Sequence, residues 1–138
     1  MRSHPISDLS TLLRSLKPVL RDGAVAFCAV DAGYDATPLN AIATFRESQG
    51  LTVVVDENIA AAHGLTPLFR AAWITLTVES DLNAVGLTAA VSSALAKAGI
   101  SCNVIAAVHH DHLFVPVDRA ADAMRVLREL SDRARPLV

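Results

Sequence analysis

Residues 51–56 read Leu-Thr-Val-Val-Val-Asp, and residues 113–118 read Leu-Phe-Val-Pro-Val-Asp. Each stretch is a short apolar run that ends in an aspartate, which is typical of a buried strand followed by a helix that the carboxylate caps. Another apolar run and a polar turn precede each stretch, so a hairpin followed by a helix occurs twice. This weak internal repeat predicts two related lobes.

Around the first stretch, apolar runs predict strands over 24–30, 42–46 and 51–55, with Gly50 supplying the positive φ of the hairpin turn. Asp56 is the expected cap of the helix that follows. A loop over 31–41 stands where a helix would connect the first two strands, so we expect an abbreviated lobe. Before it, leucines at helical spacing predict a short helix over 7–16, with Ser7 as its N-cap.

Around the second stretch, the pattern predicts a strand from 72 to 78, a helix over 84–98, strands over 102–108 and 112–117, and a last helix capped by Asp118. This order needs a crossover helix, which places both helices on one face of an antiparallel sheet. The predicted fold class is therefore α+β, with ferredoxin-like βαββα(β) lobes in tandem. We expect an N-terminal helix at 1–19, the abbreviated lobe at 20–69 and a complete lobe at 70–138.

The composition excludes several classes of protein. The 138 residues include 12 basic and 14 acidic side chains and six aromatic ones, so there is neither a basic surplus for phosphates nor a set of rings for stacking on bases. We therefore expect no nucleic-acid partner. An apolar leader and a run of about 18 apolar residues are both missing, which predicts a cytoplasmic protein without a membrane partner. Cys28 and Cys102 are expected to be reduced core residues.

Two runs in the second half carry a family likeness: Ile-Thr-Leu-Thr-Val-Glu-Ser-Asp-Leu-Asn-Ala-Val-Gly-Leu at 74–87 and Gly-Ile-Ser-Cys-Asn-Val-Ile-Ala at 99–106. They resemble the ACT domain. Within that group, residues 86–89 and 110–116 look like the tandem-ACT family of short, uncharacterised bacterial proteins, and residues 43–54 match the same family. The resemblance covers about residues 9 to 130.

The resemblance implies a regulatory protein that binds a small molecule, most often an amino acid, and acts on a partner protein in trans without catalysis. It also implies an effector loop at the first strand-to-helix turn and a facing surface at the start of the second strand. Carried onto this chain, the implied ligand-binding residues are Asp81, Leu82, Asn83, Ala84, Val85, Gly86, Leu87, Asn103, Val104 and Ile105. A lobe of about sixty residues buries little surface alone, so we also expect a homodimer.

Physical chemistry supports an anionic or zwitterionic ligand at this turn. A helix N-terminus leaves backbone N–H groups unpaired, and Gly86 lets a carboxylate approach them, while Asp81 or Asn83 is available to an ammonium group. The alternative is structural: Asp81 or Asn83 caps the helix, and Gly86 allows close packing of the helix against the strand.

His109, His110, Asp111 and His112 carry groups that bind transition metals. Neighbouring side chains of a strand point to opposite faces, so His110 and His112 share a face that His109 does not. We therefore expect a polar hairpin tip in which Asp111 holds the turn, and no metal or other cofactor. The sequence shows no nucleophile-and-base motif, so an enzyme is not predicted. Two alternatives to the sensor are an interaction module without a ligand and a metal-dependent enzyme at this hairpin.

Overall fold

The computed structural model describes residues 8–135, and they form two compact units. Of the described residues, 73–135 and the amino-terminal segment 8–21 form the carboxyl-terminal unit, and Asp22–Ala72 form the middle unit. Strand β5, Phe69–Leu76, contributes residues to both. Within the described residues, no helix is long and apolar enough to cross a membrane.

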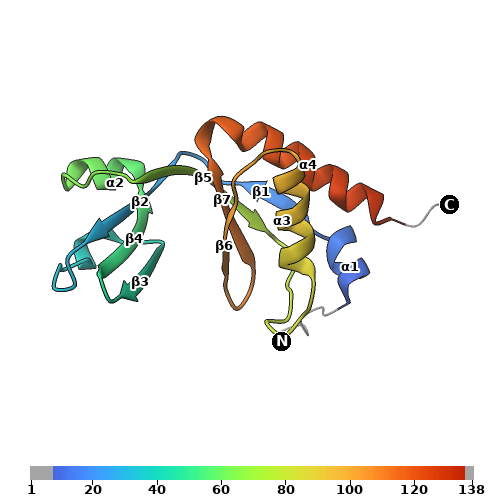
Figure 1. Ribbon diagram of the computed structural model, residues 1–138, viewed down its shortest axis with the longest axis horizontal. Helices are drawn as coiled ribbons and strands as arrows, with labels where there is room; N and C mark the ends of the chain where they lie inside the picture. The colour runs from blue at the N-terminus through green and yellow to red at the C-terminus, as the bar shows by residue number, and fades with distance from the viewer. Residues whose placement is uncertain (1–7, 136–138) are drawn as a thin grey trace. The chain divides into compact units, whose positions relative to one another are not determined.

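The carboxyl-terminal unit has a sheet in the strand order β1-β5-β7-β6, in which β1 is antiparallel to β5 and β6 is antiparallel to β7. The helices α3 and α4 contact each other and cover this sheet (Figure 1). Besides β5, its elements are α1 (Leu9–Arg14), β1 (Pro18–Leu20), α3 (Leu87–Lys97), β6 (Asn103–Ala106), β7 (Asp111–Pro116), the 3-10 turn η2 (Val117–Arg119) and α4 (Ala120–Arg133).

The amino-terminal segment completes this unit. Asp8 caps α1 by accepting a hydrogen bond from the Thr11 N–H at 3.0 Å, and the predicted cap Ser7 lies outside the described residues. Leu12 and Leu16 are fully buried, and α1 contacts α3 and α4. The strand β1 then pairs with residues 74–76 of β5. The lobe thereby gains an edge strand that the sequence pattern does not predict, because three residues are too few to show a period.

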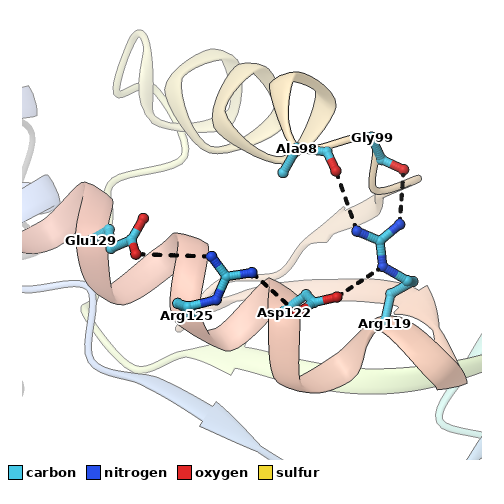
Figure 2. A network of polar contacts seen from close by, with 6 residues as sticks. All are labelled: Ala98, Gly99, Arg119, Asp122, Arg125 and Glu129. Atoms are coloured by element: carbon cyan, nitrogen blue, oxygen red, sulfur yellow. Dashed lines mark hydrogen bonds and ion pairs between the residues drawn. The ribbon is translucent and has the colours of Figure 1, made fainter.

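The start of α4 differs from the prediction. Asp118 does not cap the helix, because the turn η2 intervenes and Arg119 occupies the N-cap position without a side-chain hydrogen bond. Arg119 instead donates to the carbonyl oxygens of Ala98 and Gly99, at 3.2 and 3.3 Å, where α3 ends (Figure 2). A cation at this end of a helix satisfies unpaired carbonyls and opposes the negative end of the helix dipole. The contact ties the end of α3 to the start of α4.

The middle unit has the strand order β3-β4-β2-β5, in which each neighbouring pair is antiparallel. Asp56 accepts hydrogen bonds from the N–H groups of Asn58 and Ile59, at 2.8 and 3.4 Å, which confirms the predicted helix cap. Besides β5, its elements are β2 (Val25–Val30), the 3-10 turn η1 (Thr37–Leu39), β3 (Ala43–Glu47), β4 (Gly50–Asp56) and α2 (Glu57–Ala62).

The predicted hairpin and the abbreviated connection are both present in this unit. Gly50 has φ +145° and pairs with Glu47 at the hairpin turn. A Cβ atom on Gly50 would lie 2.5 Å from the Val30 carbonyl oxygen, so no other residue fits without a backbone shift. Between β2 and β3 there is only η1, whose Leu39 is fully buried. The core around it contains Ala26, Cys28, Val53, Val55 and Ala60.

Candidate functional site

The candidate site is the turn that joins β5 to α3. Its first part is closed by Asp81, whose Oδ1 accepts a hydrogen bond from the Asn83 N–H at 2.8 Å and whose carbonyl accepts one from the Ala84 N–H at 2.9 Å. This is an Asx-type turn, in which a short carboxylate substitutes for a backbone acceptor. The Asp81 side chain is therefore held by its own loop.

Gly86 ends the turn and begins the helix. Its φ is +103°, a conformation that side-chain-bearing residues rarely adopt. A Cβ atom there would lie 3.1 Å from Cδ2 of Leu9, so the glycine also allows α1 to approach. The close packing expected at Gly86 is present, but its partner is α1 and not the neighbouring strand.

The first turn of α3 carries no side-chain cap. Gly86 occupies the N-cap position, so the alternative in which Asp81 or Asn83 caps the helix is wrong. The first N–H groups of an α-helix lack acceptors within the helix, and together with the helix dipole they attract negative charge. The turn thus presents donors at a place where an anionic group finds partners.

A pocket of about 120 Å³ opens beside this helix end. Part of the predicted loop lines it, whereas Asn83 and Val85 do not, and neither do residues 103–105 of β6. The strand contribution comes from the other end of β6, because Ala106 pairs with Asp111 where the β6–β7 hairpin begins. The lining residues are Ser80, Asp81, Leu82, Ala84, Gly86, Leu87, Thr88, Ala106 and Asp111.

Four lining residues are missing from the ligand-binding set that the resemblance implies: Ser80, Thr88, Ala106 and Asp111. Asp111 is only 7% exposed, and its Oδ2 accepts a hydrogen bond from the Ser80 hydroxyl at 3.1 Å. The bond links the turn to the start of β7, whereas the sequence suggested that Asp111 holds its own hairpin. The two residues are 31 positions apart, so no local pattern joins them.

The histidines of the β6–β7 hairpin do not converge. His109 Nδ1 lies 3.7 Å from Oε1 of Glu79, and the rings of His109 and His110 are 6.5 Å apart. His112 instead contacts β5. Among the described residues, no group of three His, Cys, Asp or Glu side chains is arranged to hold a metal ion.

His112 belongs to a polar cluster on the sheet of the same unit. Its Nδ1 accepts a hydrogen bond from the Trp73 indole N–H at 3.0 Å and lies 3.1 Å from the Thr75 hydroxyl. Arg21 donates to that hydroxyl at 3.2 Å, and its guanidinium lies 4.7 Å from the Trp73 ring centre. Burial, followed by the nearby His110 and Arg21, lowers the pKa of His112 below its usual 6.5, although Asp111 opposes this shift.

Neither cysteine is activated. Cys28 is buried in β2, and burial raises the pKa of its thiol. Cys102 lies one residue before β6, and burial raises its pKa to about 11. The thiolate is the reactive form of cysteine, so both side chains behave as inert apolar groups near neutral pH.

Two ferredoxin-like lobes in tandem, one of them with a glycine turn between its first strand and first helix, have the architecture of ACT domains. Two sequence models, both described as ACT domain, match residues 4–72 and 69–129. The chain therefore belongs to the ACT domain family, with two such domains in tandem. No curated protein matches the sequence.

Several solved structures are similar. A Vibrio cholerae protein, described as of unknown function and as a possible transport protein, is 45% identical, with coverage of 89% of this chain and 95% of its own and a TM-score of 0.81. The regulatory subunit of aspartate kinase from Thermus thermophilus is 10% identical, with coverage of 89% and 99% and a TM-score of 0.63. An Agobacterium tumefaciens protein is 15% identical, with coverage of 83% and 87% and a TM-score of 0.63. The last two support the fold alone.

Proposed function

We propose that this chain is a cytoplasmic regulatory protein that binds an amino acid in the pocket beside α3 and has no catalytic activity of its own. The observation that carries the proposal is the uncapped N-terminus of α3, which faces a pocket lined by five residues of the predicted loop, Asp81, Leu82, Ala84, Gly86 and Leu87. ACT domains generally bind small ligands for regulation, which supports the same conclusion.

In this proposal the ligand carboxylate meets the backbone N–H groups at the start of α3. The left-handed Gly86 keeps this end of the helix free of a Cβ atom, and Thr88 places a hydroxyl on the same rim. Some residues of the expected effector surface do not line this pocket: Asn83, Val85 and Asn103–Ile105. In this proposal they reach the ligand only after the loop has closed over it.

Ligand binding would change the packing of the loop before α3, which the hydrogen bond between Ser80 and Asp111 connects to β7. In this proposal the regulated activity would reside in a second protein in trans, and a homodimer would present two copies of the pocket to it.

A thermal-shift screen against the twenty amino acids tests this proposal. A ligand at a hundredfold above its Kd stabilises the folded protein by about 2.7 kcal/mol, which raises the Tm by several degrees. Thr88→Tyr fills the rim of the pocket and should abolish the shift. Ala89→Tyr is the matched control, since Ala89 is the next exposed residue of α3 but does not line the pocket.

A flat response to all twenty amino acids would refute the proposal and favour an interaction module without a ligand. A shift that survives Thr88→Tyr and not Ala89→Tyr would place the ligand elsewhere on the molecule.

A further inference from the structure

The charged side chains that line the pocket beside α3 are all negative. Its lining contains two carboxylates, Asp81 and Asp111, and no lysine, arginine or histidine. The Asp81 carboxylate is exposed in part and is engaged by the Asn83 N–H. Asp111 is more deeply buried than Asp81, and its carboxylate is part of the pocket lining.

The Asp111 carboxylate lacks a cationic partner within residues 8–135. It accepts one hydrogen bond from the neutral Ser80 hydroxyl and forms no ion pair there. Removal of a carboxylate from water is costly unless a cation or several donors replace the lost hydration. Asp111 is thus a carboxylate of 7% exposure in the pocket lining, with one hydroxyl partner and no ion pair.

Glu79, the residue before Ser80, carries a second carboxylate that is short of hydrogen-bond donors. Oε2 of Glu79 is buried and is the one side-chain polar atom in the described part of the chain that is buried without a hydrogen-bond partner. Its other oxygen lies 3.7 Å from His109, too far for a hydrogen bond. Glu79 itself does not line the pocket, so Asp81 and Asp111 are the carboxylates that a ligand there would meet.

We propose that the ligand presents a cationic nitrogen, an ammonium or a guanidinium group, to the Asp111 carboxylate. The inference rests on the function proposed above and narrows its ligand class: zwitterionic and basic amino acids are accepted, and acidic ones are excluded. An acidic side chain would meet Asp81 or Asp111 without a positive side chain in the lining to receive it.

The test begins with calorimetric titration of the intact protein with each of the twenty amino acids. Each amino acid that binds is then compared with the α-hydroxy acid of the same side chain, which keeps the carboxylate and replaces the ammonium by a hydroxyl. We expect neutral or basic amino acids to bind, aspartate and glutamate not to bind, and the hydroxy acid to bind at least about tenfold more weakly.

Asp111→Asn separates charge from structure. The amide oxygen of asparagine still accepts from the Ser80 hydroxyl, so the link between the loop and β7 is kept while the charge is removed. We expect this variant to lose at least about tenfold in affinity for the amino acid. Asp35→Asn makes the same change at an exposed turn of the middle unit and should bind as the wild type does. Ser80→Ala, which leaves the charge, should keep the preference for the amino acid over the hydroxy acid.

The outcomes are distinguishable. Equal binding of the hydroxy acid, tight binding of glutamate, or an unchanged affinity in Asp111→Asn would overturn the charge assignment and leave the amino-acid site in place. If none of the twenty amino acids binds the wild-type protein, the proposed function itself fails and this inference fails with it. If Asp111→Asn does not fold, the comparison of amino acid with hydroxy acid in the wild type and in Ser80→Ala decides alone.

Discussion

The two units connect their first and second strands in different ways. In the carboxyl-terminal unit, β5 leads through a glycine turn into α3, a helix of 11 residues. In the middle unit, β2 leads into η1, a turn of three residues that ends at Asn40 with φ +45°. The first connection leaves an uncapped helix end beside a pocket, and the second places Leu39 in the core. The same fold can therefore use this position for a pocket or for core packing.

The strand β5 contributes residues to both domains. Residues 69–71 pair with β2 of the middle unit, and residues 74–76 pair with β1 of the carboxyl-terminal unit. The two ACT domain matches overlap at residues 69–72, which lie in this strand. One strand thus serves as the last strand of one domain and the first of the next, and β1 supplies the last strand of the second domain.

The largest expected effect tests whether η1 replaces the helix as a core element. Leu39 in η1 and Leu95 in α3 are both fully buried. Each leucine-to-alanine substitution should cost about 2–5 kcal/mol of unfolding free energy, because it removes buried methyl groups and leaves a cavity. Guanidinium denaturation followed by circular dichroism measures both. If Leu39→Ala costs much less than Leu95→Ala, the turn is a surface loop and the comparison of the two connections is wrong.

An intermediate effect is expected at the residues where each connection takes a left-handed conformation. Gly86→Ala forces a side chain into φ +103° and toward Leu9, and it should cost about 1–3 kcal/mol. Asn40→Gly removes the Cβ atom at φ +45°, a conformation that asparagine tolerates, and should change the stability by less than about 0.5 kcal/mol. Thermal denaturation of both variants gives the comparison. A Gly86→Ala variant as stable as Asn40→Gly would contradict the strain argument.

The sequence predicts those helices and strands whose hydrophobic pattern and boundary residues lie within one short stretch of the chain. The strands β2 to β4, the capped helix α2 and the helix α3 each show a period and a boundary residue within one short stretch. The amino-terminal strand β1 shows neither, since its three residues are half-buried or exposed and its partner β5 lies more than fifty positions away. The start of α4 is mispredicted for a related reason, because a 3-10 turn separates Asp118 from the first helical residue.

The sequence likewise predicts only part of the candidate site. The resemblance of the sequence to ACT domains locates the loop before α3, but the apolar stripe predicts a helix that already begins at residue 84, whereas α3 begins at Leu87 after the left-handed Gly86. The contribution of Asp111 cannot be read from the sequence, since it depends on the hairpin β6–β7 returning Asp111 to Ser80. A polar residue at a hairpin end has many local explanations, and only the fold distinguishes them.

The smallest expected effect concerns His112 of the carboxyl-terminal unit, and the control for it in the middle unit is His63, an exposed residue beyond α2. Indole N–H is only a donor, so His112 Nδ1 must be unprotonated to accept from Trp73. Since burial lowers the pKa of folded His112 below the ordinary 6.5, the native state prefers the neutral ring. Its stabilisation is complete above pH 6.5 and is lost as the pH falls through the folded pKa.

Trp73 is the only tryptophan of the chain, so its emission reports on this bond directly. Between about pH 8 and pH 5, the wild-type protein should show a change in emission and a lower Tm at the acidic end. In His112→Gln, whose amide oxygen accepts from the indole at every pH, both changes should shrink, whereas His63→Gln should retain them. An emission profile that is identical in the wild type and His112→Gln would mean that the ring does not titrate against Trp73. Because the bond joins β7 to β5, a change in both measurements would make the pairing of these two strands sensitive to protons.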